Sequence, residues 1–149
     1  MKIFVTLGTT PFDSLIKYID ENDFFKSHEV LIQSKGNYHP KNFDFFEFSD
    51  LIDDIYLESD LIITHAGAGS IYSLLEKRKK IISVPNFERV DKHQKDLSLF
   101  LQDKKLALVS WEFDSLESHI ISYESGYCPS EYKPTPFFKK NEIIDYLIG

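Results

Sequence analysis

The sequence predicts an α/β domain with a doubly wound, mostly parallel sheet and helices on both of its faces. Short β-branched runs alternate with helical patterns along nearly the whole chain, which favours parallel strands joined by right-handed crossovers. The length of 149 residues suits one domain with a sizeable core, and 42% hydrophobic with 28% charged residues is the composition of an ordinary globular protein. We therefore expect one domain over residues 1–149, with a proline-interrupted tail from about residue 123.

The first half of the chain contains four short runs that are typical of buried strands. The predicted strands are Lys2–Leu7, Glu29–Gln33, Asp44–Phe48 and Asp60–Thr64. We expect a helix after the first strand, because Thr10 suits an N-cap, Pro11 the first helical position and Asp13 the acid of a capping box. This helix should end near Asp20, and residues 49–57 show a second helical pattern.

The second half of the chain continues the alternation. Strands are predicted at Lys80–Val84 and Leu106–Val109, and helices at about Gly69–Lys77, Asp91–Leu101, Asp114–Ser122 and Asn141–Ile148. Two of these helices begin with residues that suit capping pairs, Asp91 with Gln94 and Asp114 with Glu117. We expect these side chains to close the first turns of their helices.

Charge and cysteine content argue against several classes of protein. A net charge of −7 does not suit a nucleic-acid binder, because phosphate contacts need clustered cations. Cys128 is the only cysteine, so neither an intramolecular disulfide nor a multi-cysteine metal site is expected, which fits a reducing cytoplasm. No apolar run reaches the length of a signal peptide or of a membrane span. These features together predict a cytoplasmic protein.

Three polar segments directly follow predicted strands. They are Gly8–Pro11, His65–Ser70 and Pro85–Gln94. Ligands of open parallel sheets bind beyond the carboxyl ends of the strands, which lie at one edge of the sheet. One binding site could therefore use all three segments.

The segment His65–Ser70 (HAGAGS) has the chemistry of a phosphate cradle. Glycine lets backbone N–H groups approach a ligand without an intervening Cβ, and the start of a helix supplies positive potential, so a phosphate or diphosphate would be favoured there. The same residues also suit a plain strand-to-helix turn, and the sequence leaves both interpretations open. No Gly-Lys-Ser/Thr follows as in a P-loop. The turn after the first strand lacks the dinucleotide fingerprint, so an NAD-dependent oxidoreductase is poorly supported.

Each polar side chain of these segments also has a structural interpretation. His65, at the end of a strand, can hydrogen-bond a neighbouring backbone group, and Ser70 can cap a helix. Gln94 can complete the capping box of Asp91, and His93 can be an exposed residue of the first turn. It is the convergence of the three segments at one sheet edge that favours a binding site.

With these motifs in this order, the chain resembles the glycosyltransferase family 28 C-terminal domain. The matching motifs are VTLGTTPFD at Val5–Asp13, HAGAGS at His65–Ser70, and Val84-Pro85 followed eight residues beyond Pro85 by His93-Gln94. The resemblance covers about residues 2–109. Among such domains, the short stand-alone form is similar to the catalytic-subunit half of two-component transferases, which include capsule and exopolysaccharide β-1,4-glycosyltransferases and the dolichol-linked GlcNAc transferase.

The resemblance implies one Rossmann-like half of a GT-B enzyme. Such enzymes bind a UDP-sugar and transfer the sugar to a lipid-diphosphate-linked saccharide, normally without a metal ion or other cofactor. Donor binding is thereby assigned to Gly8, Thr9, Thr10, His65, Ala66, Gly67, Ala68, Gly69, Ser70, Ser73, Pro85, His93 and Gln94. Residues 65–70 would hold the diphosphate, and His93 and Gln94 would meet sugar hydroxyls. No residue is identified as the catalytic base, for which His65 is a weak candidate.

One departure from the family pattern concerns the ribose. Related domains often carry a glutamate three residues after the serine, where it hydrogen-bonds the ribose, and here that position is Ser73. Ribose binding must therefore be weaker or made by other groups. The missing acid also favours the alternative function, a non-catalytic nucleotide-sugar-binding or regulatory subunit of such a transferase.

The resemblance also implies a partner. A GT-B enzyme has two such domains, and this chain supplies one, so we expect a membrane-anchored subunit that carries the acceptor half and recruits this chain to the inner face of the membrane. An anionic membrane would repel a net charge of −7. The candidate partner contacts are Phe137, Phe138, Ile143, Ile144, Tyr146 and Leu147. Equally, this tail could fold back onto its own domain.

Overall fold

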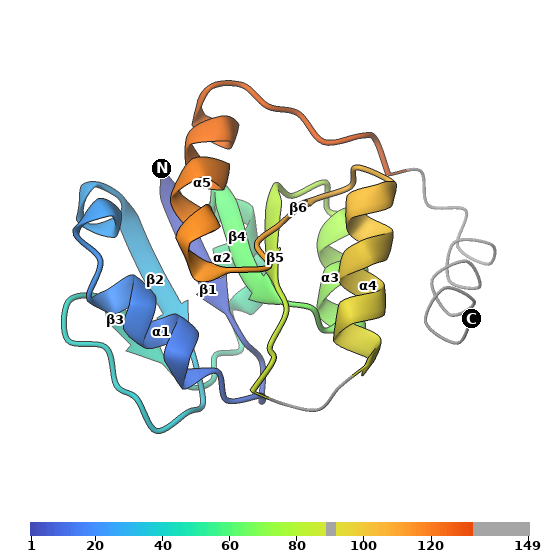
Figure 1. The fold of residues 1–149 in the computed structure, drawn as a ribbon. Coiled ribbons are helices and arrows are strands. Elements are labelled where there is room, and N and C mark those ends of the chain that lie inside the picture. The colour runs from blue at the N-terminus through green and yellow to red at the C-terminus, as the bar shows by residue number, and fades with distance from the viewer. Residues whose placement is uncertain (89–91, 133–149) are drawn as a thin grey trace.

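A computed structural model describes residues 1–88 and 92–132 of the chain (Figure 1). Its sheet contains six strands in the order β3-β2-β1-β4-β5-β6. The strands are β1 (Lys2–Thr6), β2 (Glu29–Gln33), β3 (Asp44–Phe46), β4 (Leu61–His65), β5 (Ile81–Val84) and β6 (Leu108–Val109). Every neighbouring pair is parallel, so all six carboxyl ends lie along one edge, the lower edge of the sheet in Figure 1.

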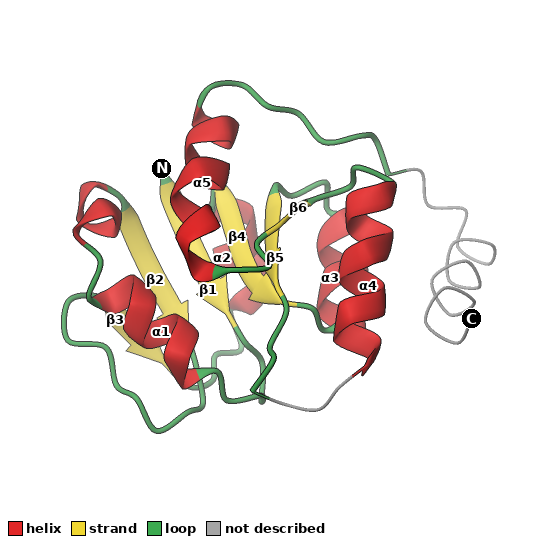
Figure 2. Cartoon of the chain, viewed as in Figure 1, coloured by secondary structure: helices red, strands yellow, loops and turns green. Residues whose placement is uncertain are grey.

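Helices cover both faces of this sheet, as predicted (Figure 2). The α-helices are α1 (Asp13–Asp20), α2 (Ile52–Glu58), α3 (Ala68–Glu76), α4 (Lys92–Asp103) and α5 (Leu116–Glu124), with 3-10 turns η1 (Asp23–Ser27) and η2 (Phe113–Ser115). Helices α1 and α5 pack on one face, and α3 and α4 on the other. The doubly wound architecture is therefore confirmed.

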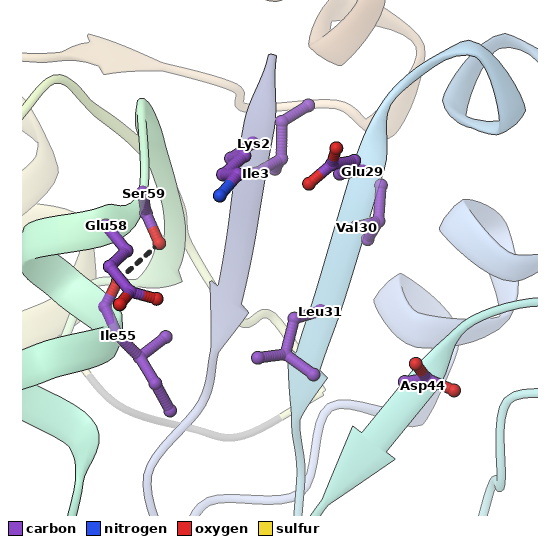
Figure 3. A pocket seen from close by; sticks show the side chains of 9 residues that line it. All are labelled: Lys2, Ile3, Glu29, Val30, Leu31, Asp44, Ile55, Glu58 and Ser59. Atoms are coloured by element: carbon purple, nitrogen blue, oxygen red, sulfur yellow. Dashed lines mark hydrogen bonds between the residues drawn. The ribbon is translucent and has the colours of Figure 1, made fainter.

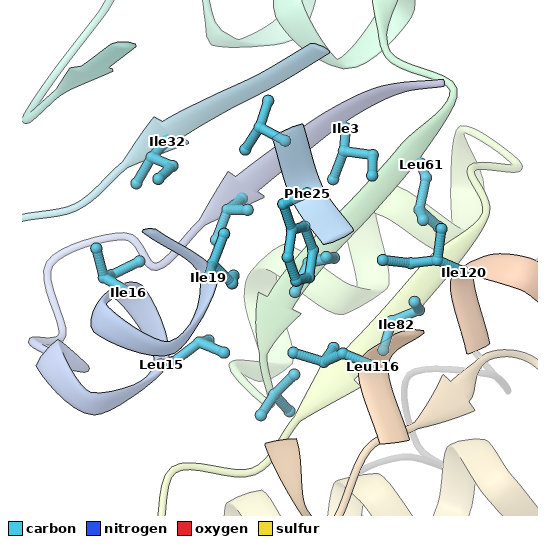
Figure 4. Close-up of a cluster of buried hydrophobic side chains, with 14 of the residues drawn as sticks. Ile3, Leu15, Ile16, Ile19, Phe25, Ile32, Leu61, Ile82, Leu116 and Ile120 are labelled. Carbon is cyan, nitrogen blue, oxygen red and sulfur yellow. The ribbon is translucent and has the colours of Figure 1, made fainter. Parts of the chain in front are cut away.

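Strand β1 supplies side chains to both hydrophobic cores. Ile3 and Val5 join the core beneath α1 and α5, which Figure 4 shows around Phe25, whereas Phe4 joins the core beneath α3 and α4. Successive side chains of a strand point to opposite faces, and a strand buried on both faces is apolar throughout. This is why the central strands are continuous hydrophobic runs rather than alternating ones.

The start of α1 differs from the prediction. The helix begins at Asp13, Phe12 stands at the N-cap position, and no side chain caps the helix, so the expected Thr10 cap is wrong. The Asp13 carboxylate accepts hydrogen bonds from the backbone N–H groups of Asn37 (3.3 Å) and Tyr38 (3.2 Å). Asp13 therefore holds the loop after β2 instead of closing a capping box.

The capping pair predicted for the last described helix is also wrong. The chain forms η2 first, and α5 starts after Ser115, which makes no side-chain capping bond. Glu117 accepts hydrogen bonds from the Tyr18 hydroxyl (2.6 Å) and from the Asn22 side-chain amide. The Glu117 carboxylate, which the local sequence pattern predicts to close a capping pair, is therefore used for a tertiary contact with α1 and the residue that follows Glu21.

Other differences lie at element ends and in one missed turn. Strand β3 ends at Phe46 rather than Phe48, and β6 has only two residues. The 3-10 turn η1 was not predicted, although the Asn22 side chain accepts from the Phe24 N–H at 3.0 Å, as an N-cap does. The predicted C-terminal helix and the proposed partner-contact residues of the tail lie outside the described residues.

Asp20, at the end of α1, fixes the connection between β2 and β3. Its fully buried carboxylate accepts from the Tyr38 hydroxyl (2.7 Å) and from the backbone N–H groups of Lys41 (2.9 Å) and Asn42 (2.8 Å). Burial by itself raises the pKa of Asp20, but these hydrogen bonds outweigh it and hold the pKa below its ordinary value.

We expect Asp20 to make stability depend on pH under acidic conditions. Because its pKa is lower in the folded chain than in the unfolded one, the stabilisation is complete above about pH 4 to 5 and is lost as the pH falls through the folded pKa. Asp20→Asn should flatten the fall in unfolding free energy between about pH 5 and pH 3. Urea denaturation at each pH measures this, with the exposed Asp50→Asn as the matched control.

Candidate functional site

A crevice is expected where β1 and β4 lie side by side at the centre of the sheet. From β1 the chain continues toward β2 and β3, and from β4 toward β5 and β6. The helices that follow these strands, α1 and α3, pack on opposite faces, so the two loops part at the sheet edge (Figure 2). In open α/β sheets this switch point is where ligands bind. The predicted segments Gly8–Pro11 and His65–Ser70 are these two loops.

The segment after β4 presents the start of α3 to the crevice. Gly67 is the N-cap residue, no side chain caps the helix, and the Gly67 N–H donates to the His65 carbonyl at 2.9 Å. The first N–H that bonds back along the helix is that of Ile71, to the Gly67 carbonyl at 3.0 Å. Among the described residues, the N–H groups of Ala68, Gly69 and Ser70 in the first turn therefore have no acceptor. Ser70 is not the N-cap, so the interpretation of Ser70 as a helix cap is wrong.

The two glycines of this segment have different surroundings. A Cβ on Gly67 would lie 2.9 Å from Nε2 of His65, so the buried imidazole packs directly against this residue. A Cβ on Gly69 would meet no atom within 4 Å. Gly67 is thus required by the histidine, and Gly69 leaves open space beside the helix start.

The turn after β1 faces the same histidine. Gly8 has a φ of +59°, a conformation that favours glycine, and a Cβ built on it would lie 4.0 Å from Cε1 of His65. His65 is 7% exposed, and its ring lies close to both glycine-containing turns. The structure therefore brings together Gly8, His65 and Gly67, which are far apart in the sequence.

Gln33, at the end of β2, holds this turn with its buried side chain. Its Oε1 accepts from the Thr6 hydroxyl (2.9 Å), the Leu7 N–H (3.0 Å) and the Gly8 N–H (2.8 Å). Its Nε2 donates to the carbonyls of Gly8 (2.8 Å) and Glu47 (2.9 Å). One side chain thus fixes the turn and ties it to the segment that follows β3.

These bonds decide which groups of the turn can meet a ligand. The N–H of Gly8 is taken by Gln33, and that of Thr10 donates to the Leu7 carbonyl at 3.2 Å. The N–H of Thr9 has no acceptor within the part of the chain that the structure describes. Thr9 is exposed, so its N–H and the two threonine hydroxyls are the donors that this turn offers.

The segment after β5 is held by Asn86. The Asn86 N–H donates to Oε1 of Gln94 at 2.8 Å, and its Nδ2 donates to the Pro11 carbonyl at 3.0 Å. The side-chain oxygen of Gln94 therefore fixes this loop. The predicted capping pair of Gln94 with Asp91 cannot be compared with the structure, because Asp91 lies outside the described residues. Pro85 and Gln94 are buried, whereas His93 is exposed. Asn86 joins the loop after β5 to the loop after β1, so all three predicted segments lie together.

Ser73 lies one turn into α3, where its hydroxyl accepts from Nζ of Lys77 at 3.0 Å. The next acid, Glu76, is exposed at the end of the helix. Position 73 therefore offers a ribose a hydroxyl group in place of the carboxylate that related domains often carry there.

Gln33 and Asn86 are the site residues that sequence reasoning missed. Each is a buried polar side chain at or just beyond the end of a strand, where a buried amide needs several hydrogen-bond partners. The polar residue that ends the apolar run EVLIQ was the available signal for Gln33.

A separate cavity of about 430 Å³ lies at the opposite, amino-terminal end of the sheet (Figure 3). Its lining mixes Lys2 and Glu29 with apolar residues such as Leu31 and Ile55. Ligands of this fold bind at the carboxyl ends, so the crevice is the stronger candidate site. Within the described ranges, no three His, Cys, Asp or Glu side chains could hold a metal ion, and no helix could span a membrane.

Known proteins show sequence similarity to this chain. It is 34% identical over 111 residues to the UDP-N-acetylglucosamine transferase subunit ALG13 of Mus musculus, a match that covers 65% of this chain and 10% of the mouse protein. It is 42% identical over 102 residues to the ALG13 subunit of Debaryomyces hansenii, covering 66% of this chain and 47% of that protein. The chain therefore matches about a tenth of the length of the mouse relative and about half of the yeast one.

Solved structures share the fold. The solution structure of ALG13 superposes with a TM-score of 0.69 at 18% identity and covers 99% of this chain and 97% of that one. MurG of Acinetobacter baumannii gives 0.54 at 15% identity, with 100% of this chain matching 53% of that enzyme. The fold is thus the Rossmann-like half of a GT-B glycosyltransferase.

The family assignment rests on the sequence match. The model of the glycosyltransferase family 28 C-terminal domain matches residues 2–123, which include the crevice loops and both faces of the sheet. This chain belongs to the glycosyltransferase family 28 C-terminal domain family.

Proposed function

We propose that this chain is the donor-binding, catalytic subunit of a two-component glycosyltransferase. The observation that carries the proposal is the first turn of α3 at the switch point of the sheet, where the N–H groups of Ala68, Gly69 and Ser70 have no acceptor among the described residues. Such a helix start favours the diphosphate of a nucleotide-sugar. UDP-N-acetylglucosamine is the first donor to test, because the relatives are named as subunits of a transferase for it.

The reaction needs the negative charge on the leaving diphosphate to be stabilised. Oriented N–H groups and the positive end of α3 supply this without a metal ion. The N–H of Thr9, in the loop after β1, is proposed to add a further donor. His93 and Gln94 are proposed to meet the sugar hydroxyls, and Pro85 belongs to the proposed donor-binding set as well.

The catalytic base is proposed to come from the partner. The acceptor hydroxyl must lose its proton as the new glycosidic bond forms. His65 packs close to both glycine-containing turns and is only 7% exposed, which supports a role in shaping the cradle rather than in reaching the acceptor.

The remaining parts of the proposal concern the partner and the acceptor. The relatives are named as subunits, which supports a partner, and the acceptor we propose is a lipid-linked saccharide at the inner face of the membrane. Capsule or exopolysaccharide synthesis is the pathway we propose. The second candidate, a non-catalytic nucleotide-sugar-binding subunit, is favoured by Ser73, whose hydroxyl is engaged by Lys77.

We expect the purified chain to bind UDP but to transfer sugar only with its partner. Isothermal titration of the chain with UDP and UDP-N-acetylglucosamine tests binding. Sugar transfer to a membrane lipid acceptor, assayed with each chain alone and with both together, tests whether the reaction needs both subunits. Full activity of the single chain would refute the two-component proposal. Transfer by the partner alone would support the non-catalytic alternative.

A further inference from the structure

A second hollow opens at the same edge of the sheet as the crevice, between the start of α1 and the segments that follow β5 and β6. Its volume is about 390 Å³. Five residues supply its apolar lining, and we call it the aromatic hollow: Phe12, Pro85, Phe87, Trp111 and Phe113. None of the N–H donors of α3 lines it, and Pro85 is the one lining residue that is also assigned to donor binding.

Two of its rings form a platform. Phe87 is 63% exposed, and its ring stacks on that of Trp111 with 6.5 Å between centroids and 21° between planes. The indole N–H of Trp111 already donates to Oε1 of Gln102 at 2.8 Å. Trp111 therefore offers a ligand the surface of its ring and not its N–H. An exposed phenylalanine leaves apolar surface in water that a ligand would cover.

Two carboxylates, Glu88 and Glu112, also line the aromatic hollow. They disfavour a phosphate or any other anion. Oε1 of Glu88 accepts from the Ser14 N–H at 3.3 Å, but a hydrocarbon chain would remove the Glu112 carboxylate and the other Glu88 oxygen from water without giving them a hydrogen-bond partner, which is costly. A neutral polyhydroxylated ring satisfies both features, because its C–H face stacks on the aromatic platform while its hydroxyls donate to the carboxylates.

A hydrogen bond joins the aromatic hollow to the crevice. Asn86 lies between Pro85 and Phe87, and its Nδ2 donates to the Pro11 carbonyl in the loop after β1. A saccharide in the hollow would therefore lie beside the loop that faces the donor site, on the side of α1 and α5.

We propose that the aromatic hollow binds a neutral saccharide. Resting on the proposed function, we assign this saccharide to the acceptor, whose diphosphate the two carboxylates keep out of the hollow. The hollow would then give this chain a share in acceptor recognition, in addition to its binding of the donor.

Trp111 is the only tryptophan in the chain, so its fluorescence reports on the hollow directly. The full chain is titrated with N,N′-diacetylchitobiose, cellobiose and lactose. We expect a saturable change with at least one of them, with affinity weakened about tenfold or more in Phe87→Ala and severalfold in Glu112→Gln. Phe45→Ala removes a 39% exposed ring that stacks on His39 at the other end of the sheet, and should leave the response unchanged.

The absence of a saturable response to every saccharide would overturn the proposal, as would an unaltered response in Phe87→Ala. An equal response to choline would assign the hollow to cations and overturn it as well. UDP is titrated separately by calorimetry. UDP binding without a saccharide response would refute the saccharide site alone, whereas a saccharide response without UDP binding would refute the proposed donor site alone.

Discussion

Gly69→Val is expected to weaken UDP binding at least about a hundredfold while leaving the fold intact. Helical Cβ atoms tilt toward the N-terminus of the helix, so the branched side chain would enter the open space beside the unbonded N–H groups of α3. Loss of two charge-assisted hydrogen bonds, at about 1.5 to 3 kcal/mol each, corresponds to this change in affinity. Valine is a better helix former than glycine, so α3 itself should not lose stability.

Isothermal titration with UDP and thermal unfolding measure the two quantities separately. Gly69→Ala, which adds only a Cβ, should give an intermediate affinity, and the exposed helical Lys17→Val serves as the control. Gly67→Val is the less selective variant, because its side chain would collide with His65 and disturb the loop as well as the ligand. Unchanged UDP affinity in folded Gly69→Val would refute the phosphate cradle.

Gln33→Leu is expected to lower both stability and donor binding. The substitution removes five side-chain hydrogen bonds and leaves the Gly8 N–H without its acceptor, whereas the Leu7 N–H keeps the backbone carbonyl of residue 33 at 3.2 Å. Each buried group left unsatisfied costs about 1 to 3 kcal/mol, so we expect a loss of about 3 kcal/mol or more, or about 6 to 12 °C in Tm. UDP affinity should fall further than unfolding alone explains, because the turn that presents Thr9 is no longer fixed.

Gln33→Glu distinguishes the contribution of the side-chain acceptor from that of the side-chain donor. It keeps the acceptor for Thr6, Leu7 and Gly8 but replaces the donor to the carbonyls of Gly8 and Glu47 with an oxygen. Its stability should lie between those of the native chain and Gln33→Leu. Gln102→Leu, which removes one hydrogen bond of an exposed glutamine, is the matched control. UDP affinity that stays native in folded Gln33→Leu would show that the glutamine has a structural role only.

The sequence predicted the sheet and the edge that holds the candidate site because these depend on local patterns. Apolar runs such as Leu61–His65 are buried on both faces, and the motifs that follow them reach one edge wherever strands are parallel. The predicted cap at Thr10 and the predicted capping pair of Asp114 with Glu117 were wrong for the opposite reason. Asp13 and Glu117 are bound by groups of distant segments, and no local pattern encodes those partners.

The site itself was predictable only in part. HAGAGS identifies a glycine-rich helix start, but the spacing of residues does not reveal that the His65 ring lies against both Gly8 and Gly67. Nor does it reveal that Gln33 takes the N–H of Gly8 and leaves that of Thr9 for a ligand. Assigning individual hydrogen bonds requires the three-dimensional positions of the loops.

The all-parallel sheet has a consequence for how the chain folds. None of its described strand pairs is a local hairpin, since β1 pairs with β2 across α1 and with β4 across α1, β2, β3 and α2. Long loops must close before the central pair Ile3 and Leu61 is formed, and such topologies fold slowly. During synthesis, β1 leaves the ribosome well before β4, so the apolar side chains of β1 remain exposed to water until β4 has been synthesised. Variants that slow this pairing are expected to lower the yield of soluble protein even where the folded state is unaffected.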